Sequence, residues 1–393
     1  MEINGKNVKA RIIAYYLPQF HPIPENDLWW GKGFTEWTNV AKAKPLFKGH
    51  CQPHIPSELG FYDLRMPEIR QQQADLARDA GIEGFCYWHY WFAPGNELLE
   101  RPFQEVLKTG EPDFPFCLGW ANHDWTSKTW ENGKSRIKNT MLKKQTYNVD
   151  EYTTHFLEIL PAFKDHRYIT VDGKPLFVVF DPLSIPNPKQ FIEIWQNLAH
   201  KNGLNGIHFV GIRHNFQTFT VNSQGKKEYH LLDPDKVPAK IQYETILNSG
   251  FDAVNSRGTL RAELKARGLF HRYYTEFLKK IFKIQCVDKY KYKDIIKYLY
   301  VNEDREETVY PTLLPNWDRT PRSGKKSIVY FDSTPEHFRQ HLKNALEVVQ
   351  NKKDEHKIVF LQSWNEWGEG NYIEPDIQFG RSYLDVLKEE IEL

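Results

Sequence analysis

Two glutamates near the C-terminal end of the chain, Glu366 and Glu369, have the type and spacing that acid–base chemistry on a sugar requires. They stand in the stretch Ser363-Trp-Asn-Glu-Trp-Gly-Glu-Gly370, among tryptophans and small glycines. Cleavage of a glycosidic bond needs one carboxyl to protonate the leaving oxygen and another to act on the opposite side of the sugar. Flat aromatic side chains beside them offer faces on which a sugar ring can rest. We therefore expect a catalytic pair, the alternative being two loop carboxylates exposed to water.

The residues before this pair predict how it is positioned. The run 358–361 is continuous, apolar and partly β-branched, which indicates a strand buried on both faces. In parallel α/β folds, the loops that leave such strands are held by a rigid scaffold and carry the chemistry. The pair is therefore expected just beyond the C-terminal tip of a parallel strand.

Candidate strands and helices alternate along the whole chain. The eight expected strands are 11–17, 84–92, 114–121, 175–180, 207–212, 251–255, 309–314 and 358–361. The expected helices are 67–80, 98–107, 149–164, 188–201, 335–351 and 381–393. This alternation predicts an α/β fold, a single (β/α)8 TIM barrel with long βα loops that occupies residues 1–393 as one catalytic domain.

Most of the expected strands end in polar or aromatic residues, the mixture that hydroxyl-rich ligands need. Besides the two glutamates, the expected substrate-binding residues are Tyr16, Gln19, His21, Trp37, His89, Trp91, Asn122, Asp124, Trp125, Asp181, Arg213, His214, Trp317, Trp364, Asn365 and Trp367. A single histidine is more often structural than catalytic, but a ring of such groups at one barrel mouth predicts a site. The tryptophans are expected to divide between core packing and stacking on sugar rings.

The sequence favours no metal ion, cofactor or nucleic acid. His89, His123 and Asp124 could supply metal ligands, but no His-x-x-x-His or His/Cys cluster accompanies them. Asp233-Pro-Asp235 has the D-x-D form found in many nucleotide-sugar transferases, yet no nucleotide-binding strand, turn and helix precede it. The formal net charge of +1 gives no global field that would attract nucleic acid.

The cysteines and the first residues indicate the compartment. The four cysteines show no close pairing and no C-x-x-C spacing, as in a protein with reduced thiols. The first residues contain no apolar signal core, and no run approaches the roughly 20 apolar residues of a membrane span. We therefore expect a cytoplasmic protein.

One segment departs from the neutral balance of charge. Residues 257–300 carry twelve Lys and Arg against four Asp and Glu, with apolar residues at helical spacing. This pattern predicts a basic helical insertion in the barrel. The insertion is either a solvated face or a platform for an anionic partner, namely a membrane surface or the diphosphate of a lipid-linked glycan. The second alternative implies weak anionic membrane association and a location peripheral to the inner membrane.

Several motifs resemble those of known carbohydrate-active families. Trp364-Asn-Glu-Trp-Gly-Glu-Gly370, followed by Tyr372-Ile-Glu-Pro375, resembles the Asn-Glu-Trp-His-Glu-Gly signature of glycoside hydrolase family 99, the endo-α-mannosidases and endo-mannanases. Ala14-Tyr-Tyr-Leu-Pro-Gln-Phe-His-Pro22, with Trp29-Trp-Gly-Lys-Gly-Phe-Thr-Glu-Trp-Thr-Asn39 and Gln52-Pro-His-Ile-Pro56, is similar to WbsX-type proteins. These are related to family 99 and are generally labelled glycosyltransferases of bacterial lipopolysaccharide assembly. The matches cover nearly the whole chain.

The resemblance implies a barrel fold and retaining, mannosidase-like chemistry in lipopolysaccharide or surface polysaccharide metabolism. By position, Glu366 matches the base that acts on the sugar 2-hydroxyl, and Glu369 matches the acid that protonates the leaving group. Gly368 departs from the hydrolase signature, which has His at this place. The resemblance implies a glycoside hydrolase-like enzyme that acts on an oligosaccharide or lipid-linked glycan. The alternatives are a glycosyltransferase of O-antigen biosynthesis and a barrel that only binds glycans.

Overall fold

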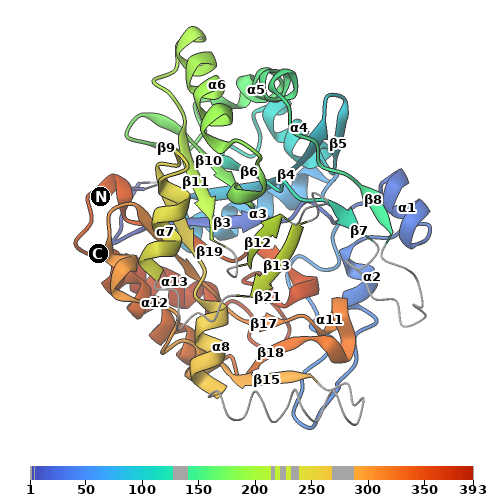
Figure 1. Ribbon diagram of the computed structural model, residues 1–393. Coiled ribbons are helices and arrows are strands. Elements are labelled where there is room, and N and C mark those ends of the chain that lie inside the picture. Colours follow the sequence, from blue (N-terminus) through green and yellow to red (C-terminus); the bar gives the residue numbers. More distant parts are fainter. Residues whose placement is uncertain are drawn as a thin grey trace.

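The computed structural model of the protein describes residues 2–3, 5–126, 140–213, 217–221, 227–231, 239–267 and 287–392. Its centre is a closed barrel of parallel strands (Figure 1). In order around the barrel, these are β3 (Arg11–Tyr16), β4 (Gly84–Ala93), β6 (Phe116–Trp120), β10 (Lys174–Val179), β11 (His208–Ile212), β14 (Ala253–Ser256), β16 (Val309–Leu313) and β19 (Ile358–Leu361). The pairing of β19 with β3 closes the ring. The predicted (β/α)8 barrel is therefore confirmed.

Helices follow the strands and cover the outside of the barrel. They are α3 (Pro67–Asp79), α4 (Arg101–Thr109), α5 (Val149–Phe163), α6 (Pro188–Lys201), α7 (Ala239–Leu247), α8 (Thr259–Arg267), α12 (Pro335–Val349) and α13 (Ser382–Ile391). In Figure 1, α5 and α6 lie on one side of the barrel, and α12 and α13 lie on the opposite side. The side chains of Asn148 and Thr334 accept backbone hydrogen bonds at the starts of α5 and α12, which satisfies N–H groups that have no partner inside the helix.

The barrel strands form the core because side chains on both of their faces are buried. All four residues of β19 are fully buried, as the apolar run 358–361 predicts. Inside the barrel, the Tyr15 ring stacks on Trp88 and on Phe360, with centroid separations of 4.8 and 5.2 Å. This close packing makes the strand tips a rigid base for the loops that follow them.

Several short elements in the βα loops were not predicted by the sequence patterns. They are α1 (Pro24–Trp30), α2 (Glu36–Val40), β5 (Asn96–Leu98), β7 (Trp125–Thr126), β8 (Met141–Lys143), β12 (Gln217–Val221), β13 (Lys227–Leu231), β15 (Asp288–Lys291), β17 (Trp317–Asp318), α11 (Thr320–Ser323) and β18 (Ile328–Phe331). The short helix α10 (Tyr292–Ile295) lies within the segment 257–300, for which helix is predicted. β15 lies within the predicted basic insertion and pairs with β18 in a small separate sheet. Residues 268–286 of that insertion lie outside the described residues. None of the helices in the described ranges has the length and apolar character that a membrane span requires.

At the N-terminal end of the barrel strands, Arg11 forms a buried ion pair. Its guanidinium donates to both carboxylate oxygens of Glu83, at 2.9 and 2.7 Å. It also donates to the backbone carbonyls of Thr170 and Glu355, at 2.9 Å each. This one side chain therefore joins four segments at the closed end of the barrel.

We expect Glu83→Gln to lower the free energy of unfolding by about 3–5 kcal/mol, because the buried Arg11 charge then loses its main partner. Asp79→Asn is the matched control, since it breaks a 2.7 Å pair with Lys388 in which the two side chains are 56% and 41% exposed. Exposed pairs of this kind contribute about 0–1 kcal/mol. Urea unfolding measures both variants, and equal shifts would contradict the prediction.

Candidate active site

A cavity of about 440 Å³ lies at the C-terminal ends of the barrel strands. Its lining residues are Tyr15, Gln19, Trp88, Tyr90, Ala121, His123, Trp125, Phe180, Arg257, Thr259, Glu263, Trp317, Arg319, Arg322, Ile328, Gln362, Ser363, Glu366, Glu369 and Asn371. Aromatic side chains, arginines and glutamates all contribute to the wall. The cavity is therefore large enough for a sugar and contains both stacking faces and titratable groups.

The chain after β19 forms a tight hairpin that carries Glu366 and Glu369. β20 (Asn365–Glu366) pairs with β21 (Asn371–Tyr372), and the 3-10 turn η6 (Trp367–Glu369) joins them. The Asn365 amide accepts from the Leu17 N–H at 2.7 Å and donates to the Leu17 carbonyl at 3.0 Å. The hairpin is thus fastened to the tip of β3, and its two glutamates reach the cavity with side chains 13% and 16% exposed.

A buried carboxylate supports this hairpin from behind. Trp367 Nε1 and the Tyr62 hydroxyl donate to one oxygen of Glu374, at 2.6 and 2.8 Å, and Gln73 Nε2 donates to the other at 2.6 Å. Burial raises the pKa of Glu374 to about 7, although the three donors favour its ionised form. Trp367 also stacks on Tyr372, with ring centroids 3.6 Å apart. The position of the turn is therefore set by side-chain hydrogen bonds as well as by packing.

One guanidinium connects the carboxylates at the cavity. Arg322, on α11, donates from Nη2 to Glu366 Oε1 at 2.5 Å and from Nη1 to Glu369 Oε1 at 2.8 Å. Its Nη2 also donates to Glu36 Oε1 at 3.1 Å. Arg319 Nη2 lies 3.0 Å from Glu369 Oε1. Within the described ranges, Glu369 therefore has two arginine partners and Glu366 has one.

Gly368 makes room for the third carboxylate. Glu36, on α2, is fully buried, and a Cβ added at Gly368 would lie 1.6 Å from Glu36 Oε1 and 3.3 Å from Arg322 Nε. Non-bonded atoms cannot approach that closely, so a side chain at position 368 and Glu36 in its observed place exclude each other. The glycine that replaces the histidine of the hydrolase signature is thus linked to the contact between Glu36 and Arg322.

Glu366 and Glu369 have different charge environments. Burial raises the pKa of Glu366 well above its usual value, and Arg322 offsets only part of this rise. Burial also acts to raise the pKa of Glu369, but the positive charges of Arg319 and Arg322 outweigh it and leave that pKa lowered. In the substrate-free site, Glu369 is therefore the more readily ionised of these two carboxyls.

The donor groups in the described part of the chain form no metal site. No three His, Cys, Asp or Glu side chains there gather as a metal ion requires. His123 lines the cavity, and burial lowers its pKa to about 4, so its ring is neutral near pH 7. The acid–base groups of the cavity are therefore carboxylates, with arginines as fixed positive charges.

The family of the chain follows from comparison with known proteins. The family described as Glycosyltransferase WbsX matches residues 12–387. This chain belongs to the WbsX family. Two relatives from Xanthomonas campestris pv. campestris, each named uncharacterized protein WxcX, are 32% identical to it over 391 residues. The match covers 98% of this chain and 50% of each relative, so the chain spans about half the length of these WxcX proteins.

Solved structures share the barrel of this WbsX-family chain. A glycoside hydrolase-like protein aligns with a TM-score of 0.57 at 14% identity, over 100% of this chain and 97% of its own. The family 99 endo-α-mannosidase of Bacteroides thetaiotaomicron, in complex with bis-tris-propane, aligns with a TM-score of 0.52 at 15% identity, over 96% and 95% of the two chains. At such identities the likeness is one of fold.

Three of the predicted substrate-binding residues line the cavity of the WbsX-family chain beside the two glutamates. They are Gln19, Trp125 and Trp317. The Trp125 ring packs edge-on against Tyr90, with centroids 5.2 Å apart. These three residues lie on different βα loops, so they line the cavity from separate segments of the chain.

The strand residues predicted for the site are displaced by one position. On β4, Trp88 and Tyr90 line the cavity, whereas His89 and Trp91 face α5. His89 Nε2 lies 2.9 Å from His155 Nε2, and Trp91 Nε1 donates to Glu158 at 2.6 Å. Similarly, Tyr15 lines the cavity, but the Tyr16 hydroxyl donates to Gln73 on α3. Successive strand side chains point to opposite faces, so an error of one residue exchanges the inside of the barrel for the outside.

Most of the other predicted residues hold loops together and do not line the cavity. The Asn122 amide donates to the Asp181 carbonyl at 2.8 Å and accepts from the Asp181 N–H at 2.7 Å, which ties the tips of β6 and β10. The exposed Asp124 accepts from the Gln145 N–H. Besides Asn122, the buried members of this group are His21, Trp37, Arg213, Trp364, Asn365 and Trp367. His214, Asp233 and Asp235 lie outside the described residues.

Five charged residues at the site were not among the predicted ones, namely Glu36, Arg257, Glu263, Arg319 and Arg322. Glu36 lies inside the motif 29–39, but its charge was not separated from the aromatic residues around it. Arg319 and Arg322 follow the polar tip 316–318 of a predicted strand by one to four residues, and Arg257 follows another strand tip by two. A charged residue within a few positions of a predicted strand tip is therefore the sequence signal that could identify these arginines.

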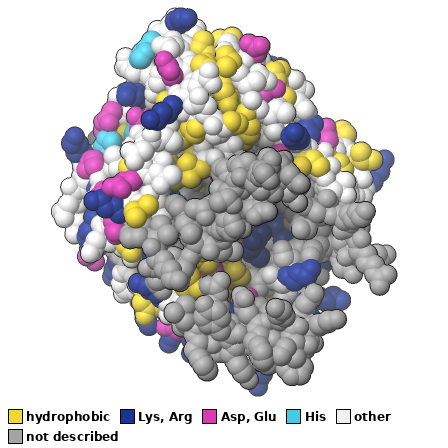
Figure 2. Space-filling view, in the orientation of Figure 1, with side chains coloured by type: hydrophobic (Ala, Val, Ile, Leu, Met, Phe, Trp, Pro, Cys, Tyr) yellow, Lys and Arg dark blue, Asp and Glu magenta, His cyan; other side chains and the backbone are white. Residues whose placement is uncertain are grey.

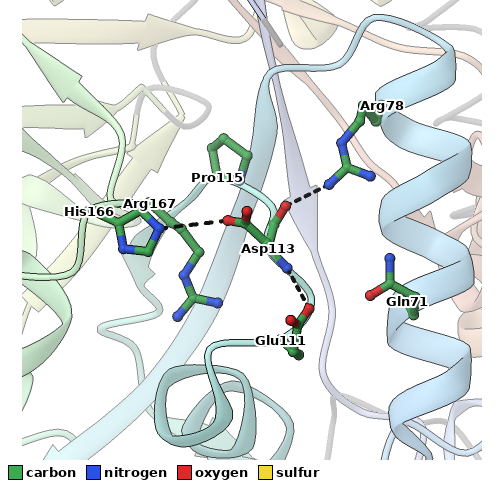
Figure 3. Close-up of a pocket in the computed structure, with 7 residues that line it drawn as sticks. All are labelled: Gln71, Arg78, Glu111, Asp113, Pro115, His166 and Arg167. Atoms are coloured by element: carbon green, nitrogen blue, oxygen red, sulfur yellow. Dashed lines mark hydrogen bonds and ion pairs between the residues drawn. The ribbon is translucent and has the colours of Figure 1, made fainter.

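A second hollow lies far from these groups, at the N-terminal end of the barrel (Figure 3). It is lined by Gln71, Arg78, Glu111, Asp113, Pro115, His166 and Arg167. Arg78 Nη2 donates to the Asp113 carbonyl at 2.6 Å, and the Asp113 N–H donates to Glu111 at 3.1 Å. Its polar groups thus bind one another, and its place below β6 separates it from the loops that carry the glutamates.

Proposed function

We propose that this protein is a carbohydrate-active enzyme that acts on glycosidic bonds of a bacterial surface polysaccharide or its precursor. The observation that supports this most strongly is the pair Glu366 and Glu369, which line one aromatic cavity and differ in their readiness to ionise. A neighbouring acid and base with pKa values pushed apart is the usual arrangement for cleaving a sugar acetal. WbsX membership and the family 99 fold support the same substrate class.

The proposed route retains the configuration of the anomeric carbon. One carboxylate removes the proton of the sugar 2-hydroxyl, so that this oxygen attacks the anomeric carbon and expels the leaving group. The other carboxyl protonates the departing oxygen. The attack leaves a three-membered 1,2-anhydro ring on the sugar. The conjugate base of the second carboxyl then removes a proton from the acceptor, which opens this ring at the anomeric carbon. By resemblance to family 99, Glu366 is the base and Glu369 is the acid.

The arginines limit when Glu369 can act as the acid. Both Arg319 and Arg322 hold its carboxylate ionised in the substrate-free site. Protonation of Glu369 therefore requires that the bound sugar displace at least one guanidinium, which would let burial raise its pKa. In the reverse assignment of roles, Glu366, whose pKa is already raised, is the acid and Glu369 is the base.

Glycosyl transfer is the second candidate, because the matched family is described as a glycosyltransferase. Hydrolysis passes the glycosyl group to water, whereas transfer passes it to another sugar, and the same two carboxyls serve both. The test is to incubate the purified protein with α-mannan-type oligosaccharides and with nucleotide sugars plus acceptors, and to separate the products by chromatography. Free reducing sugar supports hydrolysis, and a lengthened acceptor supports transfer. No product from any combination would contradict both.

The proposal extends to the form of the substrate, which is a glycan attached to a lipid. A lipid-linked substrate brings the protein to an anionic membrane surface, where exposed cations are favoured. Among the described residues of the basic segment, Lys265, Lys289, Lys291, Lys293 and Lys297 are exposed. A location at the cytoplasmic face of the inner membrane would follow from such binding.

We expect the protein to sediment with anionic lipid vesicles at low salt and to be released by added salt. Each basic residue near the charged surface contributes roughly 1 kcal/mol, so several together give measurable binding. Neutral vesicles provide the control, and Lys291→Glu with Lys293→Glu should weaken binding to the anionic ones. Equal recovery with both vesicle types would leave these lysines as a solvated face.

A further inference from the structure

Arg257 is a positive charge at the cavity that the glutamates do not neutralise by direct contact. It follows β14 immediately and lines the cavity. Its guanidinium carbon lies 5.5 Å from the centroid of the Tyr15 ring and 5.9 Å from that of Phe180. In the described part of the chain, no carboxylate forms an ion pair with it, and its buried Nε has no hydrogen-bond partner. Arg319 and Arg322, in contrast, both bind Glu369.

This placement is costly for the free protein. Burial lowers the pKa of Arg257 because it disfavours the cation, and Tyr15 and the more distant Glu369 offset this only in part. The ring faces attract the guanidinium, yet its buried Nε still has no hydrogen-bond acceptor. An anionic ligand would provide both the missing acceptors and the opposite charge, and arginine binds carboxylate and phosphate groups through two N–H donors at once.

The residues that follow Arg257 add backbone N–H hydrogen-bond donors beside its guanidinium. Helix α8 begins at Thr259, which also lines the cavity. The first turn of a helix has N–H groups without partners inside the helix and carries a partial positive charge, which favours an anion. Gly258 keeps the turn between Arg257 and Thr259 close to its neighbours, since a Cβ there would lie 2.0 Å from the Leu299 carbonyl oxygen. The guanidinium and the helix start are thus held on one side of the cavity.

Positively charged side chains are found both on this face of the molecule and in the lining of the cavity. Dark-blue Lys or Arg side chains are visible near the middle of the face, between the grey atoms (Figure 2). Among the lining residues, three arginines accompany three glutamates. Two of those arginines bind Glu369, while Glu263 accepts a hydrogen bond from the Tyr330 hydroxyl. Arg257 is therefore the lining cation best placed to meet a charge brought in by the substrate.

We propose that the glycan bound in this cavity carries a negatively charged group, a carboxylate or a phosphate, and that Arg257 and the first turn of α8 bind that group. This inference deepens the proposed function, because it names the class of sugar on which the glutamates act. Arg257 is a specificity-determining residue in this scheme. An acidic sugar is retained through its charge, and a neutral sugar of the same shape leaves the guanidinium without an acceptor.

Calorimetric binding of matched sugars to the intact protein tests the inference without requiring turnover. The probes are D-mannose, D-mannuronate and D-mannose 1-phosphate, with D-glucose, D-glucuronate and D-glucose 1-phosphate in parallel, and inorganic phosphate alone. We expect at least one acidic sugar to bind about tenfold or more tightly than its neutral counterpart, and this preference to weaken as salt is added. Preference for the uronate or for the sugar phosphate identifies which charged group the site takes.

Variants of Arg257 link the preference to this residue. Arg257→Gln should remove the difference in affinity between acidic and neutral sugars. Arg257→Lys, which keeps the charge but not the planar fork, should retain part of the preference and guards against a folding defect in the Gln variant. Lys265→Gln is the matched control, because it removes one positive charge from the exposed side of the same helix, and it should behave as the parent.

The inference is overturned if the parent binds acidic and neutral sugars equally, if no acidic sugar binds at about 10 mM, or if Arg257→Gln keeps the preference. Strong binding of inorganic phosphate alone that survives in Arg257→Gln would likewise count against it. Failure of the proposed function looks different, because it would appear as no glycan turnover while the Arg257-dependent preference remained measurable.

Discussion

Glu369→Gln should reduce turnover of a natural glycan by about 10²–10⁴-fold and leave much of the turnover of an activated aryl glycoside. Glutamine has nearly the shape of glutamate but cannot donate a proton to the leaving oxygen. A sugar leaving group needs that proton, whereas an aryl group with a low pKa departs without it. Comparison of kcat/KM for the two substrate types isolates the proton donation from other effects of the substitution.

Glu366→Gln should be slow on both substrate types by a similar factor, because removal of the 2-hydroxyl proton precedes departure of any leaving group. The two variants are therefore controls for each other, since both remove one carboxylate from Arg322. Rescue of Glu366→Gln by the aryl glycoside, with no rescue of Glu369→Gln, would assign the roles in the opposite order. Turnover within a few-fold of the parent on a natural glycan would remove the affected residue from the catalytic pair.

Gly368→Ala should both destabilise the protein and impair the site. The added Cβ would lie 1.6 Å from Glu36 Oε1, so the carboxylate must leave its buried place or the turn η6 must shift. Overpacking of this kind costs about 1–3 kcal/mol, and any shift of η6 moves Glu369 relative to the substrate. Thermal unfolding and kcat/KM should therefore fall together in this variant.

Combining Gly368→Ala with removal of the Glu36 side chain tests whether the two positions compete for the same space. Glu36→Ala empties the space that the new Cβ would occupy, so Gly368→Ala should cost much less in that background. A double-mutant cycle should give a coupling energy of about 0.5–3 kcal/mol. Independent, additive costs for Gly368→Ala and Glu36→Ala would contradict the steric link.

The barrel could be predicted because its signals are local. Each strand is a short apolar run followed by turn residues, and α6 has the predicted bounds because Pro188 begins it and Asn202 with Gly203 ends its regular pattern. The glutamate pair was recognisable for the same reason, since both residues lie within one short motif at a strand tip. Residues that lie close together in this part of the structure are also close together in the sequence.

The rest of the site depends on contacts between distant segments. Glu36 and Arg322 are 286 residues apart, and no local pattern relates them. The displaced assignments on β3 and β4 have a different cause: strands buried on both faces show no polar alternation, so the sequence does not reveal which side chains face inward. The chemistry of His89 and Trp91 favours them as site residues, but their neighbours Trp88 and Tyr90 are the ones that line the cavity.

The guanidinium of Arg322 also couples the motion of three loops. Glu36 belongs to the loop after β3, Arg322 to the loop after β16, and the two catalytic candidates to the loop after β19. His50 and Gln52 tie the first loop to the second again, through Asp318 at 2.7 Å each. Opening of any one loop must break contacts shared with the others, so amide hydrogen exchange in the three loops should report one common free energy of opening. Access to the cavity would then be a single cooperative opening event.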